Sequence, residues 1–452
     1  MATTPAESLA RLRVVIPPNV REVCETLAKA GHEAVAVGGA VRDALLGREP
    51  GDWDVATSAR PEQVMALFRK TIPTGLQHGT VTIVTGRGES SHVEVTTFRG
   101  EGAYTDARRP DHVVFGVPLV EDLARRDLRV NAMAYDPAKH ELIDPFGGQR
   151  DLAERMLRAV GPTGDVYEDA VARFTEDGLR VMRAVRFAAA LEFELDPDTE
   201  RGMIPALPSL AKVSKERICE ELRKMLATRQ PSRALRIAER SGILALILPE
   251  LHAGLSRWIA DRGLAVQSWL ERVEAAPAEA RLGALIADVA KPEAMLRRLD
   301  RDAVKQAADL LRRLKFSNDE IAVASVLVGT VSAARHVIDW SDAEIRRLLA
   351  DVTRPHARAA VALWRADGVT GLADRAAAIL DRKDALATSE LAVAGKDLID
   401  ALAIKPGPSV GRILAALLAR VLDDHTLNTR DQLLQIAQGM ELLLARDQEG
   451  PP

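Results

Sequence analysis

The sequence predicts an α+β protein, in which a small mixed β-sheet backed by helices is followed by a long helical region. Short β-rich runs, such as residues 34–37 and 81–84, are confined to residues 30–146. After Gly147-Gly148 the apolar residues recur at helical spacing, and prolines mark breaks between the segments. Aromatic residues make up only 4% of the chain, while Ala, Leu and Arg dominate its second half, as in helical proteins.

A chain of 452 residues is long enough to form several domains. Pro17-Pro18 interrupts an apolar pattern near the N-terminus, which predicts a broken helical lead-in. We expect a lead-in at residues 1–29, a sheet-containing head at 30–148, a helical neck at 149–230, a helical body at 231–350 and a helical tail at 351–452.

Composition predicts a soluble, cytoplasmic protein with no membrane partner. The chain has two cysteines, Cys24 and Cys219, which are far apart and lack metal-ligand spacing, as expected in a reducing compartment. It contains no run of 18 apolar residues and does not begin with a basic-then-apolar signal pattern.

The net charge gives little support for RNA binding. A formal charge of −4 is unfavourable for a nucleic-acid-binding protein, where a basic face is expected. Residues 212–233 contain seven Lys or Arg against three Glu. This strip is only modestly basic and could equally be a solvated helix surface.

A glycine turn follows the first β-rich run. Residues 34–37 (Ala-Val-Ala-Val) predict a buried strand, Gly38-Gly39 a turn, and residues 40–46 a helix. Glycines let backbone N–H groups approach phosphate oxygens, and the helix N-terminus and Arg42 add positive charge there. The alternative is an ordinary strand–turn–helix corner with a solvated arginine.

Two aspartates follow closely. Alternation along a strand at residues 53–57 places Asp52 and Asp54 on one face, about 7 Å apart, where they repel unless a cation lies between them. Oxygen ligands of this kind favour Mg²⁺ completed by substrate phosphates, and two ions can serve the attacking and leaving oxygens. Glu94 could face the pair from a neighbouring strand, or it could be a solvated strand residue.

The chain resembles the class II tRNA nucleotidyltransferases, or CCA-adding enzymes, and their relatives the bacterial poly(A) polymerases. The resemblance covers residues 30–230 and rests on five ordered motifs, which are similar to the catalytic, ribose-recognising, hinge, nucleotide-selecting and neck-helix motifs of the family. These motifs lie at residues 38–54, 125–132, 144–152, 176–187 and 216–226. The resemblance implies a polymerase-β-like nucleotidyltransferase head, followed by an all-α neck, body and tail.

The implied reaction is template-independent addition of C, C and A from CTP and ATP to the 3′ end of tRNA, with release of pyrophosphate. Asp52 and Asp54 would hold two Mg²⁺ ions, and Gly39, Arg42 and Arg126 would hold the triphosphate and sugar. The helices beyond residue 230 would bind tRNA. The sequence leaves the oligomeric state open.

The fourth motif can also be interpreted from its chemistry. On a helix, Asp177 and Arg180 would lie three residues apart on one face. The carboxylate accepts and the guanidinium donates, so the pair matches the Watson–Crick edges of cytosine and adenine and opposes those of guanine and uracil. Arg183 and Arg186 would supply charge to the triphosphate. The alternative is a set of surface ion pairs.

Gly178, within this motif, departs from the family, where proline or alanine is expected. We expect it to soften the helix start without removing a functional group.

Three alternative functions remain open. Residues 74–82 are similar to the CCA-adding version of this segment, which disfavours a poly(A) polymerase. Residues 99–117 form a long polar connection, which from sequence alone could be a plain surface loop. They also resemble the loop that complete CCA-adding enzymes use and that partial C- or A-adding relatives tend to lack or alter, and Asp106, Arg108 and Arg109 are present within it. A catalytically silent RNA-binding protein is the alternative from another class, although a silent relic would be free to lose Asp52, Asp54 and Asp177.

Overall fold

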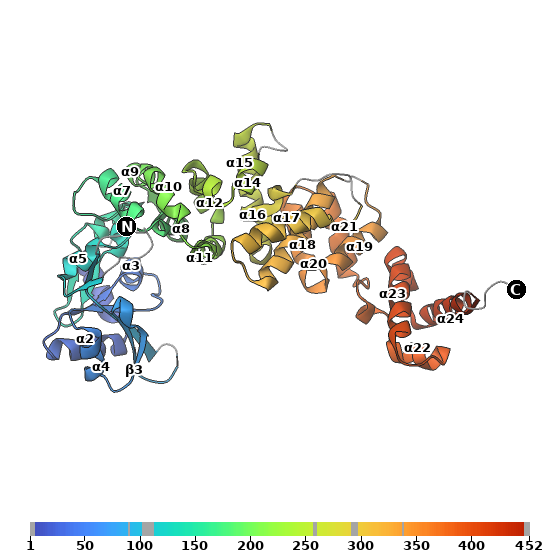
Figure 1. The fold of residues 1–452 in the computed structure, drawn as a ribbon, viewed down its shortest axis with the longest axis horizontal. Coiled ribbons are helices and arrows are strands. Elements are labelled where there is room, and N and C mark those ends of the chain that lie inside the picture. Colours follow the sequence, from blue (N-terminus) through green and yellow to red (C-terminus); the bar gives the residue numbers. More distant parts are fainter. Residues whose placement is uncertain are drawn as a thin grey trace. The chain divides into compact units, whose positions relative to one another are not determined.

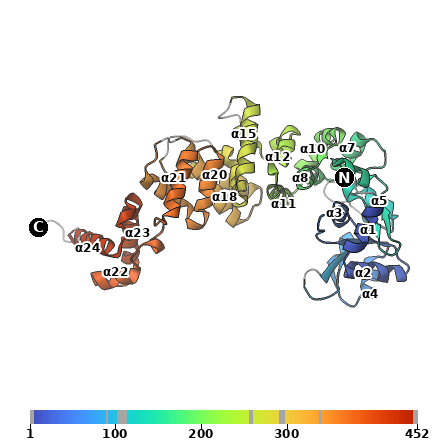
Figure 2. The same ribbon diagram turned by 180° about the vertical axis from the view of Figure 1, so that it is seen from behind.

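The computed structural model describes residues 5–88, 91–101, 113–255, 260–290, 297–336 and 339–446. The chain separates into two compact units, Met1–Ile247 and Leu248–Pro452, which we describe individually (Figures 1 and 2).

A seven-stranded mixed sheet forms the centre of the first part of unit 1, in the order β3-β4-β5-β2-β1-β8-β9. The pair β2–β5 is parallel, and the other neighbours are antiparallel. The strands are β1 (Ala34–Val37), β2 (Asp54–Thr57), β3 (Thr71–Gly75), β4 (Thr80–Val84), β5 (His92–Thr97), β8 (Ala134–Asp136) and β9 (Glu141–Ile143).

Alternation of side chains gives this sheet a buried face. In β5, Val93 and Val95 are buried while His92 and Glu94 are exposed. Helices α2 (Pro18–Lys29) and α4 (Pro61–Leu67) pack against the central strands (Figures 1 and 2). The mixed sheet predicted within residues 30–146 is therefore confirmed.

Shorter elements surround the sheet. A separate antiparallel pair, β6 (Arg99–Glu101) and β7 (Val113–Phe115), precedes α5. The helices here are α1 (Pro5–Val15), α3 (Gly39–Leu45), α5 (Leu119–Ala124), and the 3₁₀ turns η1 (Leu76–His78) and η3 (Arg129–Asn131). Residues 102–112, which contain Asp106, Arg108 and Arg109, lie outside the described residues.

Within the predicted hinge at residues 144–152, the side chain of Asp144 caps the N-terminus of a helix. The Asp144 carboxylate accepts hydrogen bonds from the backbone N–H groups of Gly148 and Gln149 at 2.7 and 2.9 Å, at the beginning of α6 (Gly148–Glu154). A Cβ atom on Gly148 would lie 2.5 Å from the carbonyl oxygen of Arg129, so only glycine allows this approach.

Helices then dominate unit 1, with one exception. The neck also contains a short parallel pair, β10 (Met156–Leu157) and β11 (Glu194–Leu195), because the chain returns beside itself after α8. The helices are α7 (Val166–Glu176), α8 (Leu179–Leu191), α9 (Pro197–Arg201), α10 (Met203–Ala211), α11 (Lys215–Leu226), α12 (Pro231–Arg240) and α13 (Ile243–Ile247). Since α12 packs on α8 and α13 packs on α10 and α12, unit 1 extends past the predicted neck boundary at residue 230.

The described part of unit 2 is helical. Its elements are α14 (Pro249–Gly254), α15 (Arg262–Ala275), η4 (Ala278–Ala280), α16 (Arg281–Ile286), η5 (Ala287–Val289), α17 (Arg301–Arg313), α18 (Asn318–His336), α19 (Asp342–Val352), α20 (Arg354–Ala366), α21 (Thr370–Asp381), η6 (Thr388–Glu390), α22 (Gly395–Leu402), α23 (Pro408–Asp423), η7 (His425–Leu427) and α24 (Arg430–Arg446). Helices α22, α23 and α24 share an apolar cluster that includes Leu398, Leu417 and Leu433. None of the described helices has the length and apolar character needed to cross a membrane.

Gly178 has a packing role that the sequence did not indicate. It joins α7 to α8, and a Cβ atom there would lie 2.2 Å from the backbone nitrogen of Leu210 and 2.3 Å from the carbonyl carbon of Ser209. The backbone of α10 therefore approaches this residue too closely for any larger side chain.

Gly178→Ala is expected to destabilise unit 1 by about 1–3 kcal/mol, because α10 would have to move. Urea unfolding followed by circular dichroism measures the change. Gly51→Ala is the matched control, since nothing lies within 4 Å of its added Cβ atom. Equal stability of the two variants would contradict the close packing at Gly178.

Candidate active site

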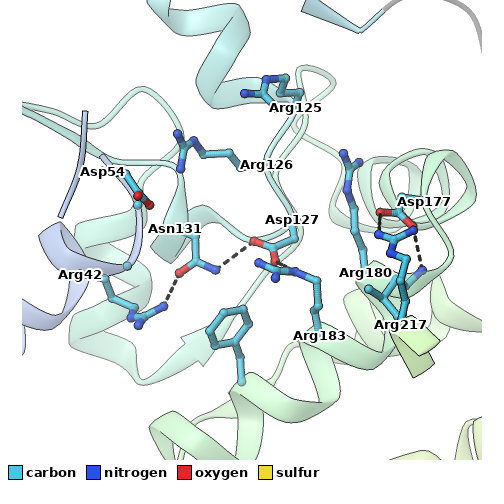
Figure 3. A pocket seen from close by; sticks show the side chains of 14 residues that line it. Arg42, Asp54, Arg125, Arg126, Asp127, Asn131, Asp177, Arg180, Arg183 and Arg217 are labelled. Atoms are coloured by element: carbon cyan, nitrogen blue, oxygen red, sulfur yellow. Dashed lines mark hydrogen bonds and ion pairs between the residues drawn. The ribbon is translucent and has the colours of Figure 1, made fainter. Parts of the chain in front are cut away.

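A pocket of about 420 Å³ lies between the glycine turn of the sheet domain and the neck helices, entirely within unit 1 (Figure 3). Six arginines and three aspartates line it together with two glycines, an asparagine, a leucine and a phenylalanine. The lining residues are Gly38, Gly39, Arg42, Asp54, Arg125, Arg126, Asp127, Asn131, Asp177, Leu179, Arg180, Arg183, Phe187 and Arg217. The excess of arginine suits a polyanionic ligand such as a triphosphate.

The glycine turn forms one wall of the pocket. Gly38 has a φ of 79°, which favours glycine, and α3 begins at Gly39, one residue before the predicted start. A Cβ atom on Gly38 would lie 2.9 Å from Nη1 of Arg126, so the guanidinium of Arg126 packs directly over the turn. The strand at residues 34–37 has the predicted bounds.

A chain of hydrogen bonds crosses the pocket floor from the sheet domain to the neck (Figure 3). Nη1 of Arg42 donates to Oδ1 of Asn131 at 2.5 Å, and Nδ2 of Asn131 donates to Oδ1 of Asp127 at 2.9 Å. Nε of Arg183 donates to Oδ2 of Asp127 at 2.7 Å. Burial alone would raise the pKa of Asp127, but Arg183 and Asn131 hold this pKa well below its usual range, which favours the ionised carboxylate.

Asp54 begins β2 and lies at the opposite side of the pocket from Asp177 (Figure 3). It is paired directly with Glu94 of the parallel strand β5, so both carboxylates lie on the same face of the sheet. The Asp54 side chain is open to the pocket, yet the protein around it removes much of its water. This desolvation, followed by the nearby negative charge of Glu94, raises the pKa of Asp54 to about 6, although Arg126 opposes the shift.

Asp52 differs from the prediction. It lies in an exposed bend before β2 and does not line the pocket, so the expectation that both aspartates project from one strand is wrong. The reason is the length of the partner strand. β1 ends at Val37, which pairs with Asp54, and the chain then turns at Gly38, so the ladder cannot reach Asp52.

Asp177 and Arg180 both line the pocket but do not form the predicted pair on one helix. Asp177 has extended dihedral angles at the junction of α7 and α8, where its Oδ1 accepts the backbone N–H of Leu179 at 3.0 Å. Nη1 and Nη2 of Arg217 donate to Oδ1 and Oδ2 of Asp177 at 3.2 and 2.7 Å. Nη1 of Arg180 donates instead to Glu176 at 2.7 Å. Because the helix is interrupted at Asp177, the helical spacing that would place Asp177 and Arg180 on one face does not apply.

Arg186, predicted to contact the triphosphate, does not line the pocket. Its Nε donates to the buried Glu221 at 2.6 Å, and its guanidinium lies 4.2 Å from the centre of the Phe187 ring. The guanidiniums of Arg42 and Arg183 lie 5.2 and 5.5 Å from the same ring. Phe187 therefore gathers three arginines that come from two parts of unit 1.

The basic strip at residues 212–233 is largely paired. Arg217 binds Asp177, Arg233 binds Glu194, and both Arg223 and Lys224 bind Glu220. These ion pairs offset part of the strip's positive charge, so the strip by itself adds little support for an RNA-binding face.

Comparison with known proteins identifies the family. Residues 34–158 match the "Poly A polymerase head domain", residues 192–255 match the "Probable RNA and SrmB- binding site of polymerase A", and residues 297–437 match a second tRNA nucleotidyltransferase domain. The CCA-adding enzyme of Geobacillus thermodenitrificans (strain NG80-2) is 38% identical over 421 residues, which cover 91% of this chain and 94% of that protein. The chain belongs to the CCA-adding enzymes.

Two further relatives agree with this membership. The CCA-adding enzyme of Lactococcus lactis subsp. lactis (strain IL1403) is 36% identical over 90% of this chain and 94% of that protein. A crystal structure of the Bacillus stearothermophilus CCA-adding enzyme in complex with CTP superimposes with a TM-score of 0.70, at 30% identity, over 96% of this chain and 100% of that one. The predicted nucleotidyltransferase activity and the fold, a mixed-sheet head followed by helices, are confirmed.

CCA-adding enzymes belong to a nucleotidyltransferase family that generally uses Mg²⁺. Within the ranges that the structure describes, no three His, Cys, Asp or Glu side chains are grouped as a ready-made metal site. The carboxylates of Asp54 and Glu94 nevertheless suit a divalent cation, because their mutual repulsion is one cause of the raised pKa of Asp54. Mg²⁺ typically takes one or two carboxylates and completes its coordination with water and substrate phosphates.

Sequence reasoning missed several residues of this CCA-adding site. Arg125, Asn131 and Phe187 lie inside the recognised motifs, beside residues that were predicted, so a systematic reading of each motif could have found them. Arg217 pairs with Asp177 across 40 positions of the chain. No local spacing predicts such a contact, since it depends on how α11 packs on α8.

Without metal, the wild-type protein is expected to lose stability relative to Asp54→Asn as the pH rises. The pKa of Asp54 is about 6 in the folded protein against an ordinary 3.8, so the folded state holds a proton that the unfolded state releases. The free energy of unfolding of the wild-type protein therefore decreases as the pH rises from about 3.8 to about 6. Thermal midpoints of both proteins in EDTA, measured from about pH 4 to pH 8, test this shift. If the difference in thermal midpoint between the wild-type protein and Asp54→Asn did not change with pH, the raised pKa of Asp54 would be contradicted.

Proposed function

We propose that the pocket in unit 1 binds one CTP or ATP at a time, and that Asp54 lies at its reacting end. The observation that carries this proposal is the placement of Asp54 and Asp177 on opposite sides of one arginine-lined pocket (Figure 3). One end offers carboxylates for Mg²⁺ and the other offers hydrogen-bonding groups for a base. An incoming nucleotide has the same two chemically distinct ends.

The protein's own residues orient the triphosphate. The glycine turn and the short helix α3 present backbone N–H groups at one wall, beside Arg126. Nε of Arg126 is buried and has no hydrogen-bond partner among the described residues, so it can donate to a phosphate or sugar oxygen. Arg183 and Arg42 complete the positive surface, while their bonds to Asp127 and Asn131 fix their positions.

The proposed metal ligands are Asp52 and Asp54, with Glu94 as a third candidate carboxylate. Bound Mg²⁺ would activate the attacking 3′-hydroxyl and stabilise the charge of the triphosphate as pyrophosphate leaves. Asp54 lines the pocket, and Asp52 lies two residues before it in an exposed bend. After desolvation and Glu94, the charge of Asp52 is a further cause that raises the pKa of Asp54, so the two carboxylates are close enough to sense each other.

Base selection is proposed to rest on Asp177 and Arg180. A carboxylate can accept the exocyclic amine of cytosine or adenine, and a guanidinium can donate to the adjacent ring nitrogen. Arg217 donates to both oxygens of Asp177 and so fixes the plane of the carboxylate. Oδ1 also accepts the backbone N–H of Leu179, so the remaining acceptor capacity for a base lies on Oδ2. Glu176 similarly fixes the position of Arg180. Asp177 and Arg180 together thus act as a rigid template for the base.

The RNA partner is proposed to be tRNA lacking its 3′ triplet, held by the helices of unit 2. The match of residues 297–437 to a second tRNA nucleotidyltransferase domain supports this assignment. Recognition by shape and phosphate contacts suits a chain whose net charge is −4, because only the contacting face needs to be basic. The finer division into a body at 231–350 and a tRNA-binding tail at 351–452 remains our prediction.

The proposed location is the cytoplasm, where tRNA is a substrate and thiols stay reduced. Cys24 and Cys219 are both buried, and neither belongs to a disulfide within the described residues, in agreement with this location. Burial also raises the pKa of the Cys24 thiol to about 12, so this cysteine is unreactive.

Incubation of the protein with Mg²⁺ and tRNA lacking its 3′ triplet tests the function. We expect two added nucleotides with CTP alone and three with CTP plus ATP. Long tails from ATP alone would identify a poly(A) polymerase, and a stop after two or after a single A would identify a partial enzyme. Absence of growth with all four nucleotides would favour a silent RNA-binding protein.

A further inference from the structure

A buried carboxylate outside the pocket is paired with two of the arginines that line the pocket. Asp122 of α5 does not line the pocket, and its side chain is only 1% exposed. Its Oδ1 accepts hydrogen bonds from Nε and Nη2 of Arg125 at 3.0 and 2.7 Å, and its Oδ2 contacts Nη2 of Arg126 at 3.5 Å. A carboxylate removed from water must be paired, and here both of its ion-pair partners are pocket residues.

The end of α5 explains why one acid can hold both arginines. Arg125 is the C-cap residue, three positions after Asp122, and Arg126 follows in the bend where the chain leaves the helix, so both side chains reach the same carboxylate. Two adjacent guanidiniums repel each other, and Asp122 is the main group opposing the loss of charge on Arg126, whose pKa is lowered first by desolvation and then by Arg125. Without the acid, the two side chains would separate or turn to solvent.

The contacts leave donors free on the pocket side. Each guanidinium has five N–H donors, and Asp122 occupies two on Arg125 and one on Arg126. Arg126 also packs over the Gly38 turn, where a phosphate would meet the backbone N–H groups. Asp122 also accepts the backbone N–H of Arg99 at 3.3 Å, which ties α5 to the start of β6.

We infer that Asp122 is a positioning residue for the triphosphate: it holds Arg125 and Arg126 side by side so that both aim at the phosphates of CTP and ATP alike. This inference rests on the proposed function. Because the phosphates are common to both substrates, the effect of losing Asp122 is independent of the base, unlike the effect of losing Asp177.

Steady-state kinetics of the full-length Asp122→Asn variant on tRNA lacking its triplet tests the inference. We expect the KM for CTP and for ATP to rise by the same factor, about 10- to 100-fold, as charge-assisted hydrogen bonds are lost. The Ki of inorganic pyrophosphate, which has neither base nor sugar, should rise in parallel, and discrimination against GTP should stay unchanged. Glu121→Gln, an exposed acid on the same helix, is the matched control and should behave as wild type.

Several outcomes would overturn the inference. Unchanged KM and Ki values would do so, as would a fall in thermal midpoint accompanied only by a lower kcat, which indicates a purely structural acid. If Asp122→Asn does not fold, Asp122→Glu provides the second variant, and its longer side chain should retain part of the pyrophosphate affinity. Failure of wild-type protein to extend tRNA would instead refute the proposed function, so the two failures are distinguishable.

A double-mutant cycle tests whether Asp122 acts through Arg126. Asp122→Asn and Arg126→Gln should each raise the pyrophosphate Ki, and the double variant should raise it by much less than the product of the two factors. Independent, multiplicative effects would contradict the positioning role.

Discussion

Asp54→Asn is expected to reduce nucleotide addition by at least about 10³-fold, as is typical when a central catalytic group is lost. Asparagine keeps the shape of the side chain but removes the charge that would attract Mg²⁺ at the reacting end of the pocket. We do not expect the loss to come from unfolding, because Asp54→Asn removes a charge that is desolvated and repelled by Glu94, which should stabilise the metal-free variant above pH 6. Quenched-flow addition of one C to tRNA lacking its triplet measures the rate.

Glu62→Gln is the matched control for this experiment. Glu62 is an exposed acid in the first turn of α4, outside the pocket, and its loss should leave the rate within about twofold of wild type, as for most surface substitutions. Retention of more than a tenth of the wild-type rate by Asp54→Asn would remove Asp54 from the reacting end. Asp52→Asn tests separately whether the exposed bend joins the site.

Asp177→Ala is expected to relax the choice of base, with discrimination against GTP and UTP falling by at least about 10²-fold. Guanine and uracil present a carbonyl where cytosine and adenine present an amine. In the wild-type protein this carbonyl, a hydrogen-bond acceptor, would face the Asp177 carboxylate, which is also an acceptor, and the two would repel. Removal of the carboxylate removes this repulsion. It also releases Arg217 from Asp177, so that Arg217 can donate a hydrogen bond to the carbonyl of guanine or uracil. Ratios of kcat/KM for the four nucleotides, each supplied singly, measure the discrimination.

Asp198→Asn is the control for selectivity, because Asp198 is a surface acid of the neck whose side chain is 49% exposed. It should leave all four ratios unchanged. If Asp177→Ala also left them unchanged, the template would have to lie elsewhere. Arg180→Ala should relax the choice in the same direction, since the two residues read neighbouring atoms of the base edge.

Local patterns predicted the elements that depend on short stretches of chain. The strand at residues 34–37, the glycine turn and the helix after it follow from apolar runs and punctuating glycines within ten residues. The alternation around Glu94 correctly predicted its exposed face, and the sheet register places it beside Asp54. These features need no knowledge of distant parts of the chain.

Contacts between distant segments were not predictable in the same way. The pairing of Asp177 with Arg217, the bond from Arg183 to Asp127 and the diversion of Arg186 to Glu221 each join residues at least 35 positions apart. Each depends on how the neck helices pack, which periodicity alone does not specify. The same packing explains why α12 and α13 belong to unit 1 although the sequence placed a boundary at residue 230.

Competition binding tests most directly the central claim that one pocket serves both nucleotides. Labelled CTP would be bound to the Mg²⁺-loaded protein in equilibrium dialysis and challenged with unlabelled ATP, GTP or UTP. We expect one CTP per chain, complete displacement by ATP and little displacement by GTP or UTP. ATP that binds without displacing CTP, or GTP that displaces it as well as ATP does, would contradict a single selective pocket.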